Sequence, residues 1–215
     1  FYLDDLEGAL FLLRRAIKIQ GEVGIYRGFE GQVLFEIGQF DEARRSLERA
    51  LALEPECAHS TYHLALVAEH AGRLEEAERL FAKAARLAPE LYPLPIRIGA
   101  AEFEAAAEQA LKSLPETIHK YAENCPVIIE DLPSDEIVKR EYVSPQVLGL
   151  FLGVPATEAG ASPTLGTLQR IDTDRILLFK RNLERIAKDH DDLVEQIHVT
   201  VKHEIGHFLG MDEEE

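Results

Sequence analysis

Small and apolar residues recur at intervals of 34 residues along the first 90 positions of the chain. A fixed period of this length is typical of helical hairpins that stack as repeats. Gly38 and Gly72 are equivalent positions, where a left-handed residue turns the chain between the helices of a hairpin. The pattern therefore predicts two complete hairpins after one unpaired helix. The residues in register are Leu6, Phe40 and Leu74; Ala9, Ala43 and Ala77; Leu13, Leu47 and Phe81; and Ala16, Ala50 and Ala84.

The apolar runs of the second half are shorter and differ in period. A helical stripe predicts a helix over residues 100–114, and strand-like runs lie at 126–130 and 175–180. Residues 147–153 are apolar but too few to assign to strand or helix. Residues 155–173 are rich in Pro, Gly, Ser and Thr, which predicts a long loop, either a lid or a surface loop. The helical stripe consists of Phe103, Ala106, Ala107, Ala110 and Leu111.

These patterns predict an α+β chain of two domains. The helical repeats occupy residues 1–91, and a smaller domain of strands and helices occupies 96–215. Each repeat buries its apolar face only against a neighbour, so two and a half repeats are few for a stable array. The helix at 100–114 is the nearest candidate to cap the array while opening the second domain.

The charge of the chain restricts its partners. Among 215 residues, 39 are acidic and 23 basic, which gives a formal net charge of -16. Nucleic-acid binding requires clustered Lys and Arg, so we expect no nucleic-acid partner and favour basic or apolar ones. The acidic excess is larger after residue 90, where 23 acidic residues accompany 12 basic ones.

The composition also bears on location. No apolar run is long enough to span a bilayer, and no charged-then-apolar leader is visible, so we expect a cytoplasmic protein without a membrane partner. Cys57 and Cys125 are too few for a disulfide framework. They predict reduced, buried thiols.

A candidate metal site lies near the end of the sequence. His203 and His207 are four residues apart, so on a helix both imidazoles lie on one face and can reach one ion. Glu204 flanks that face, where it can take a proton from a metal-activated water without being a ligand. We expect the helix to begin at Asp191–Asp192, with Asp192 and Glu195 forming a capping box. The spacing predicts a Zn²⁺ site.

Catalytic zinc has three protein ligands and one open position, so one ligand remains to be found. Glu213 is the first candidate and Asp212 the alternative. A continuous helix would carry Glu213 roughly 15 Å from His203, so the chain must turn back. Gly210 is placed for that turn, because glycine after a helix end adopts the left-handed conformation readily.

The 34-residue pattern resembles the tetratricopeptide repeat, over about residues 4–91. The resemblance implies a concave groove that binds a protein or peptide partner. Phe35, Tyr62 and Leu66 are our candidates for partner contacts within it. The whole groove would comprise Ile25, Gly28, Gln32, Phe35 and Glu36 from one repeat and His59, Tyr62, Leu66, Glu69 and His70 from the next.

The terminal string fits H-E-x-x-H-x-x-G-x-x-[HDE] and resembles the metzincin-type zincins, with a carboxylate as third ligand. Residues 99–215 also resemble a small bacterial family of minimal zincin-like metallopeptidases. That family typically has aspartate as the third ligand, which maps to Glu213. The resemblance implies a small mixed sheet with the active-site helix behind it. In zincins a strand like 175–180 borders the cleft and pairs with an extended substrate.

Together these observations predict a zinc-dependent metallopeptidase with a repeat domain that binds a protein or peptide. In this hypothesis His203, His207 and Glu213 hold Zn²⁺, and Glu204 is the general base. The alternative is a protein-interaction adaptor whose metal site is structural or vestigial. Glu204 discriminates between the two, because a structural site needs ligands but no base beside them.

Overall fold

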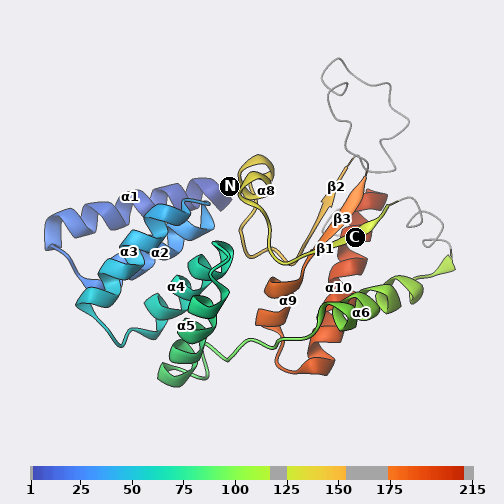
Figure 1. Cartoon of the computed structure of the whole chain (residues 1–215). Helices are drawn as coiled ribbons and strands as arrows, with labels where there is room; N and C mark the ends of the chain where they lie inside the picture. Colours follow the sequence, from blue (N-terminus) through green and yellow to red (C-terminus); the bar gives the residue numbers. More distant parts are fainter. Residues whose placement is uncertain (1, 117–124, 154–173, 211–215) are drawn as a thin grey trace, which may run out of the picture. The chain divides into compact units, whose positions relative to one another are not determined.

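The computed structural model describes residues 2–116, 125–153 and 174–210, and it divides into two units (Figure 1). Unit 1 contains the chain up to Pro95 together with Pro133–Gln146. Unit 2 contains Ile96–Leu132 and the chain from Val147 onward. The division near residue 95 lies close to the boundary expected from the sequence. Residues 133–146 depart from the expected division, because they come from within the expected second domain but pack in unit 1.

Unit 1 is built from helical hairpins. The helix α1 (Tyr2–Gln20) is followed by α2 (Gly24–Glu36) with α3 (Phe40–Leu53), and by α4 (Ala58–His70) with α5 (Leu74–Leu87). Gly38 and Gly72 connect the helices of the two hairpins with φ of 74° and 71°, as the sequence predicts. A side chain at either position would be strained, because L-residues rarely adopt positive φ.

The residues in register form the core of unit 1. Ala43 and Ala77 are 0% and 1% exposed, and Leu47 and Phe81, one helical turn later, are equally buried. Alanine lets paired helices approach closely, while the larger residues fill the space between them. The 34-residue period therefore corresponds to packing positions, as expected of stacked repeats.

Unit 2 contains a three-stranded sheet of order β1-β3-β2. The strands are β1 (Val127–Glu130), β2 (Gly149–Leu152) and β3 (Arg175–Phe179). β1 is parallel to β3 and β2 is antiparallel to it, so the sheet is mixed, as the zincin-like resemblance implies. The short apolar run at 147–153 thus supplies a strand. The expected loop at 155–173 lies outside the described residues.

The expectation that the strand at 175–180 pairs with an extended substrate is wrong. β3 lies between β1 and β2, with neighbours on both sides (Figure 1). Its backbone donors and acceptors are used within the sheet, so it has no free edge for an extended peptide. Among the described residues, the edges belong to β1 and β2.

Two long helices supply much of the core of unit 2. α6 (Ala100–Lys112) and α10 (His190–Leu209) pack together through apolar faces that include Phe103, Leu193 and Ile197, each 0% exposed. The predicted helix at 100–114 is confirmed, and it belongs to this core. α10 begins one residue before Asp191, and its cap is Asp189, whose carboxylate accepts the N–H of Asp192 at 2.9 Å. The expected capping box is therefore replaced by a cap three residues upstream.

The first residues of unit 2, 96–98, are held in place by Glu184 on the helix α9 (Lys180–Ile186). Its fully buried carboxylate accepts hydrogen bonds from the Ile98 N–H at 3.1 Å and from the Arg97 guanidinium at 3.0 Å. Lys180, four residues earlier, pairs with the same carboxylate. These donors compensate the cost of burying the charge and hold residues 96–98 against α9.

Both cysteines are free thiols, as expected. Cys125 is buried, and burial raises its pKa to about 11, whereas Cys57 is half-buried. No helix among the described residues is both long and apolar enough to cross a membrane.

Candidate active site

The candidate catalytic residues lie in the last turns of α10. One face of this helix carries Ile197, Val201, Ile205 and Phe208, all buried in the core of unit 2. Because that face is fixed by packing, the rotation of the helix about its axis is fixed too. His203 is exposed and His207 half-buried on neighbouring turns, while Glu204 is buried at 6% exposure. The sequence motif is thus held on a rigid element.

The two histidines converge. The Nε2 atoms of His203 and His207 lie 3.0 Å apart, and their rings meet nearly edge to face with centroids 4.5 Å apart. Two imidazoles on one tetrahedral zinc, at about 2.0–2.1 Å each, have nitrogens roughly 3.3 Å apart. The separation in this structure is close to that value, so the pair fits a shared metal ion without a change of helix geometry.

Glu204 is held from the neighbouring strand. Its Oε2 accepts a hydrogen bond from the backbone N–H of Phe151 on β2 at 2.8 Å. Burial raises the pKa of Glu204, while the Phe151 N–H and the two histidines act to lower it. A raised carboxylate pKa suits a residue that must both accept and return a proton near neutral pH.

The close approach of α10 to β2 depends on Gly149, which sequence analysis did not single out. A Cβ at this position would lie 2.7 Å from Thr200 Cγ2 and 2.9 Å from Glu204 Cγ. At such distances the Thr200 and Glu204 side chains would have to shift, so glycine lets the strand pass close beside the helix without displacing them. The glycine within the run 147–153 was a visible signal, but its partner on α10 was not.

Comparison with known proteins agrees with the geometry. Residues 122–215 match the family model described as Zincin-like metallopeptidase. Residues 30–91 match the model described as Tetratricopeptide repeat. Both resemblances stated from the sequence are confirmed, in the same order along the chain. A comparison with curated proteins gave no match.

The third ligand of the zincin-like site stays a prediction. Glu213 and Asp212 lie outside the described residues, and no group of three metal-binding side chains occurs within them. The helix end expected at Gly210 is confirmed. α10 ends at Leu209, and Gly210 follows with φ of 76° and donates its N–H to the carbonyl of His207 at 3.0 Å.

The expected partner contacts in the tetratricopeptide groove differ in accessibility. Phe35 and Leu66 are 2% and 1% exposed within the core of unit 1, so they offer almost no surface to a ligand. Tyr62 is half-buried and stacks on Tyr92, with ring centroids 4.7 Å apart. Of the three residues, Tyr62 is the one available for contact.

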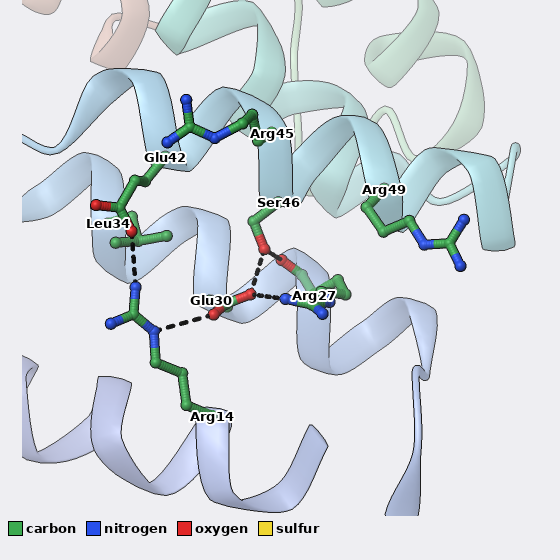
Figure 2. Close-up of a pocket in the computed structure, with 8 residues that line it drawn as sticks. All are labelled: Arg14, Arg27, Glu30, Leu34, Glu42, Arg45, Ser46 and Arg49. Carbon is green, nitrogen blue, oxygen red and sulfur yellow. Dashed lines mark hydrogen bonds and ion pairs between the residues drawn. The ribbon is translucent and has the colours of Figure 1, made fainter. Parts of the chain in front are cut away.

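Unit 1 also contains a polar cavity of about 340 Å³, shown in Figure 2, whose charged residues hold helices together. At its centre Glu30, 4% exposed, accepts hydrogen bonds from Arg27 at 2.7 Å, from Arg14 at 3.3 Å and from the Ser46 hydroxyl. Burial raises the pKa of Glu30, but the bonds from Ser46 and the arginines outweigh it, so the pKa is lowered overall. The network ties α1, α2 and α3 together.

Proposed function

We propose that the zincin-like region is a zinc-dependent peptidase and that the tetratricopeptide repeats bind a protein or peptide. The observation that carries the proposal is the placement of the buried Glu204 beside the convergent pair His203 and His207. A site that only holds a metal needs no buried carboxylate with a raised pKa between its ligands. The family match at 122–215 supports the same reaction class.

His203 and His207 would hold Zn²⁺ through Nε2, with Glu213 or Asp212 as the third ligand. Bound there, zinc supplies Lewis acidity, which activates a water and polarises the scissile carbonyl. Glu204 accepts the proton of the attacking water and returns it to the leaving amine. Its Oε2 is engaged by the Phe151 N–H, and Oε1 accepts no hydrogen bond from the described residues. Oε1 is therefore the oxygen that exchanges the proton.

β2 is the strand placed to align a substrate. It pairs with β3 on one side, and its other edge is unpaired among the described residues. An extended peptide added to that edge would form backbone hydrogen bonds close to Glu204, since Phe151 of the same strand holds the Glu204 carboxylate. We assign substrate alignment to β2 in place of β3.

The experiment compares hydrolysis of a peptide library by the zinc-loaded full chain, its Glu204→Gln variant and a matched control. Gln keeps the acceptor for the Phe151 N–H but cannot take a proton, so turnover should fall by a factor on the order of 10² to 10⁴. Glu195→Gln changes an exposed glutamate of the same helix and should leave turnover unchanged. Equal hydrolysis by all three proteins would refute Glu204 as the general base, and hydrolysis by none of them would favour an adaptor with a structural metal site.

A further inference from the structure

The connection between β1 and β2 leaves unit 2 and packs in unit 1. β1 ends at Glu130 and β2 begins at Gly149, yet residues 133–146 belong with the helical repeats. This returning segment, residues 133–146, contains the short helix α8 (Asp135–Glu141). Ile137 and Val138 on α8 are 9% and 4% exposed, so the segment buries apolar side chains in unit 1.

Glu36, the last residue of α2, is the first anchor of the returning segment. Its carboxylate is 6% exposed and accepts hydrogen bonds from the Ser144 hydroxyl and from the Gln146 side-chain amide, one at each oxygen. The Gln146 N–H in turn donates to the Ser144 hydroxyl oxygen at 3.0 Å. A buried carboxylate depends on such donors, because it has lost those of water.

His70, the last residue of α4, is the second anchor. Its Nε2 lies 3.0 Å from the carbonyl oxygen of Pro133, which can only accept, so the ring nitrogen is the donor. Its Nδ1 lies 3.6 Å from the Asp135 carboxylate. The ring stacks on Phe40 with centroids 3.9 Å apart, which fixes its orientation.

The two anchors are equivalent positions of successive repeats. Glu36 and His70 are 34 residues apart, one repeat period, and each ends the first helix of its hairpin. Beside Glu36, the Cγ1 of Val138 would be 3.0 Å from a Cβ at Gly38, whereas a Cβ at the equivalent Gly72 would meet nothing within 4 Å. The surface is thus a repeated feature of the array that one helix of the same chain occupies.

We propose that the ends of α2 and α4 form a recognition surface whose occupant is the returning segment, so that the repeats hold the connection between β1 and β2 as an intramolecular clamp. At this surface Glu36 accepts hydrogen bonds from hydroxyl and amide donors, and His70 donates one to a backbone carbonyl. Gly38 leaves room for a branched apolar side chain.

The clamp ends directly before the strand that supports Glu204. The carbonyl of Val147, next in sequence to Gln146, accepts the side-chain amide of Asn182 on α9, and β2 follows at Gly149. Release of the returning segment therefore frees the chain up to Gln146, directly before the Val147 carbonyl that Asn182 holds. This consequence for catalysis rests on the proposed function, whereas the clamp itself does not.

The test is amide hydrogen exchange on the full chain. Glu36→Ala removes both acceptors, and Ser144→Ala/Gln146→Ala removes both donors. Each change should speed exchange of residues 133–146 at least about tenfold, because hydrogen bonds to a charged group stabilise by about 1.5–3 kcal/mol. The triple variant should add little to either change, since all remove the same interaction. Lys139→Ala, on the exposed side of α8, is the control and should exchange like the wild type.

The clamp would be overturned if residues 133–146 exchanged at the wild-type rate in both variants. It would also be overturned if the two effects on the exchange rate added fully in the triple variant. Exchange of residues 149–152 and Glu204-dependent hydrolysis are measured on the same proteins. If exchange of 133–146 rises as expected in a chain without any hydrolytic activity, the clamp stands and the proposed function fails. If exchange of 133–146 is unchanged while hydrolysis depends on Glu204, the proposed function stands and the clamp fails.

Discussion

Glu204 on α10 and Phe151 on β2 are 53 residues apart in sequence and are joined by a 2.8 Å hydrogen bond from the Phe151 N–H to the Glu204 carboxylate. This bond connects the candidate general base to the strand assigned to substrate alignment. It forms because Gly149 leaves room for the Glu204 side chain beside the strand. The position of the base therefore depends on a residue outside the HExxH motif.

Gly149→Ala should disable this arrangement. The new methyl group would meet the Thr200 and Glu204 side chains at 2.7 and 2.9 Å, so these side chains, or the helix that carries them, must shift. We expect a loss of about 1–3 kcal/mol in stability from overpacking, and a loss of turnover on the order of 10² from a displaced base. Thermal unfolding and peptide hydrolysis measure the two effects.

Gly206→Ala, in α10 itself, is the matched control. A Cβ there meets nothing within 4 Å, and alanine favours a helix interior over glycine by about 0.5–1 kcal/mol. This variant should unfold at a slightly higher temperature than the wild type. Similar behaviour of the two variants would show that Gly149 does not govern the approach of β2 to α10.

His63 in α4 should make unit 1 sensitive to acid. Burial, and the nearby His59, lower its pKa from 6.5 to about 4. The unfolded chain therefore binds the proton more readily between these values, and stability present above pH 6.5 is lost as the pH falls toward 4. The loss is about 3 kcal/mol over that window. Chemical unfolding of the full chain followed at several pH values measures it.

His63→Gln should flatten this pH dependence. Gln keeps a donor for the His59 carbonyl, to which the His63 Nδ1 lies 2.9 Å away, but does not titrate. His190→Gln, at an exposed position of α10, should leave the dependence in place. A dependence that survives in His63→Gln would assign the acid sensitivity to other groups.

Glu30 should be required for the packing of α1–α3 around the cavity of Figure 2. Glu30→Ala removes the buried carboxylate that Arg27 and the Ser46 hydroxyl share, although Arg27 keeps Glu22 and the hydroxyl keeps the Arg27 carbonyl as acceptors. We expect a loss of about 2–3 kcal/mol. Glu42→Ala removes an exposed partner of Arg14 and should cost less than about 1 kcal/mol. Equal costs in thermal unfolding would show that burial of Glu30 is not what matters.

Local and periodic features could be read from the sequence. The 34-residue register identified the buried alanines Ala43 and Ala77, because stacking repeats impose the same contact at each period. The helical positions of His203, Glu204 and His207 follow from spacing alone. Gly210 was recognisable as the helix end because a single residue carries that signal.

Features that depend on contacts between distant residues could not be predicted from the sequence. Strand order placed β3 in the centre of the sheet, and nothing local distinguishes a central strand of five residues from an edge strand. The support of Glu204 by Phe151 and Gly149 joins elements 50 or more residues apart. The anchoring of residues 133–146 by Glu36 likewise pairs residues 108 and 110 apart, which no periodicity reveals.

The zinc content of the purified full chain tests the central claim most directly. Wild type loaded with zinc and freed of excess metal should retain about one ion per chain, as should His190→Ala, which removes an exposed histidine at the start of the same helix. His203→Ala and His207→Ala should each retain none, because the loss of one of two convergent imidazoles leaves too few ligands. Full zinc occupancy in both of these variants would contradict the account.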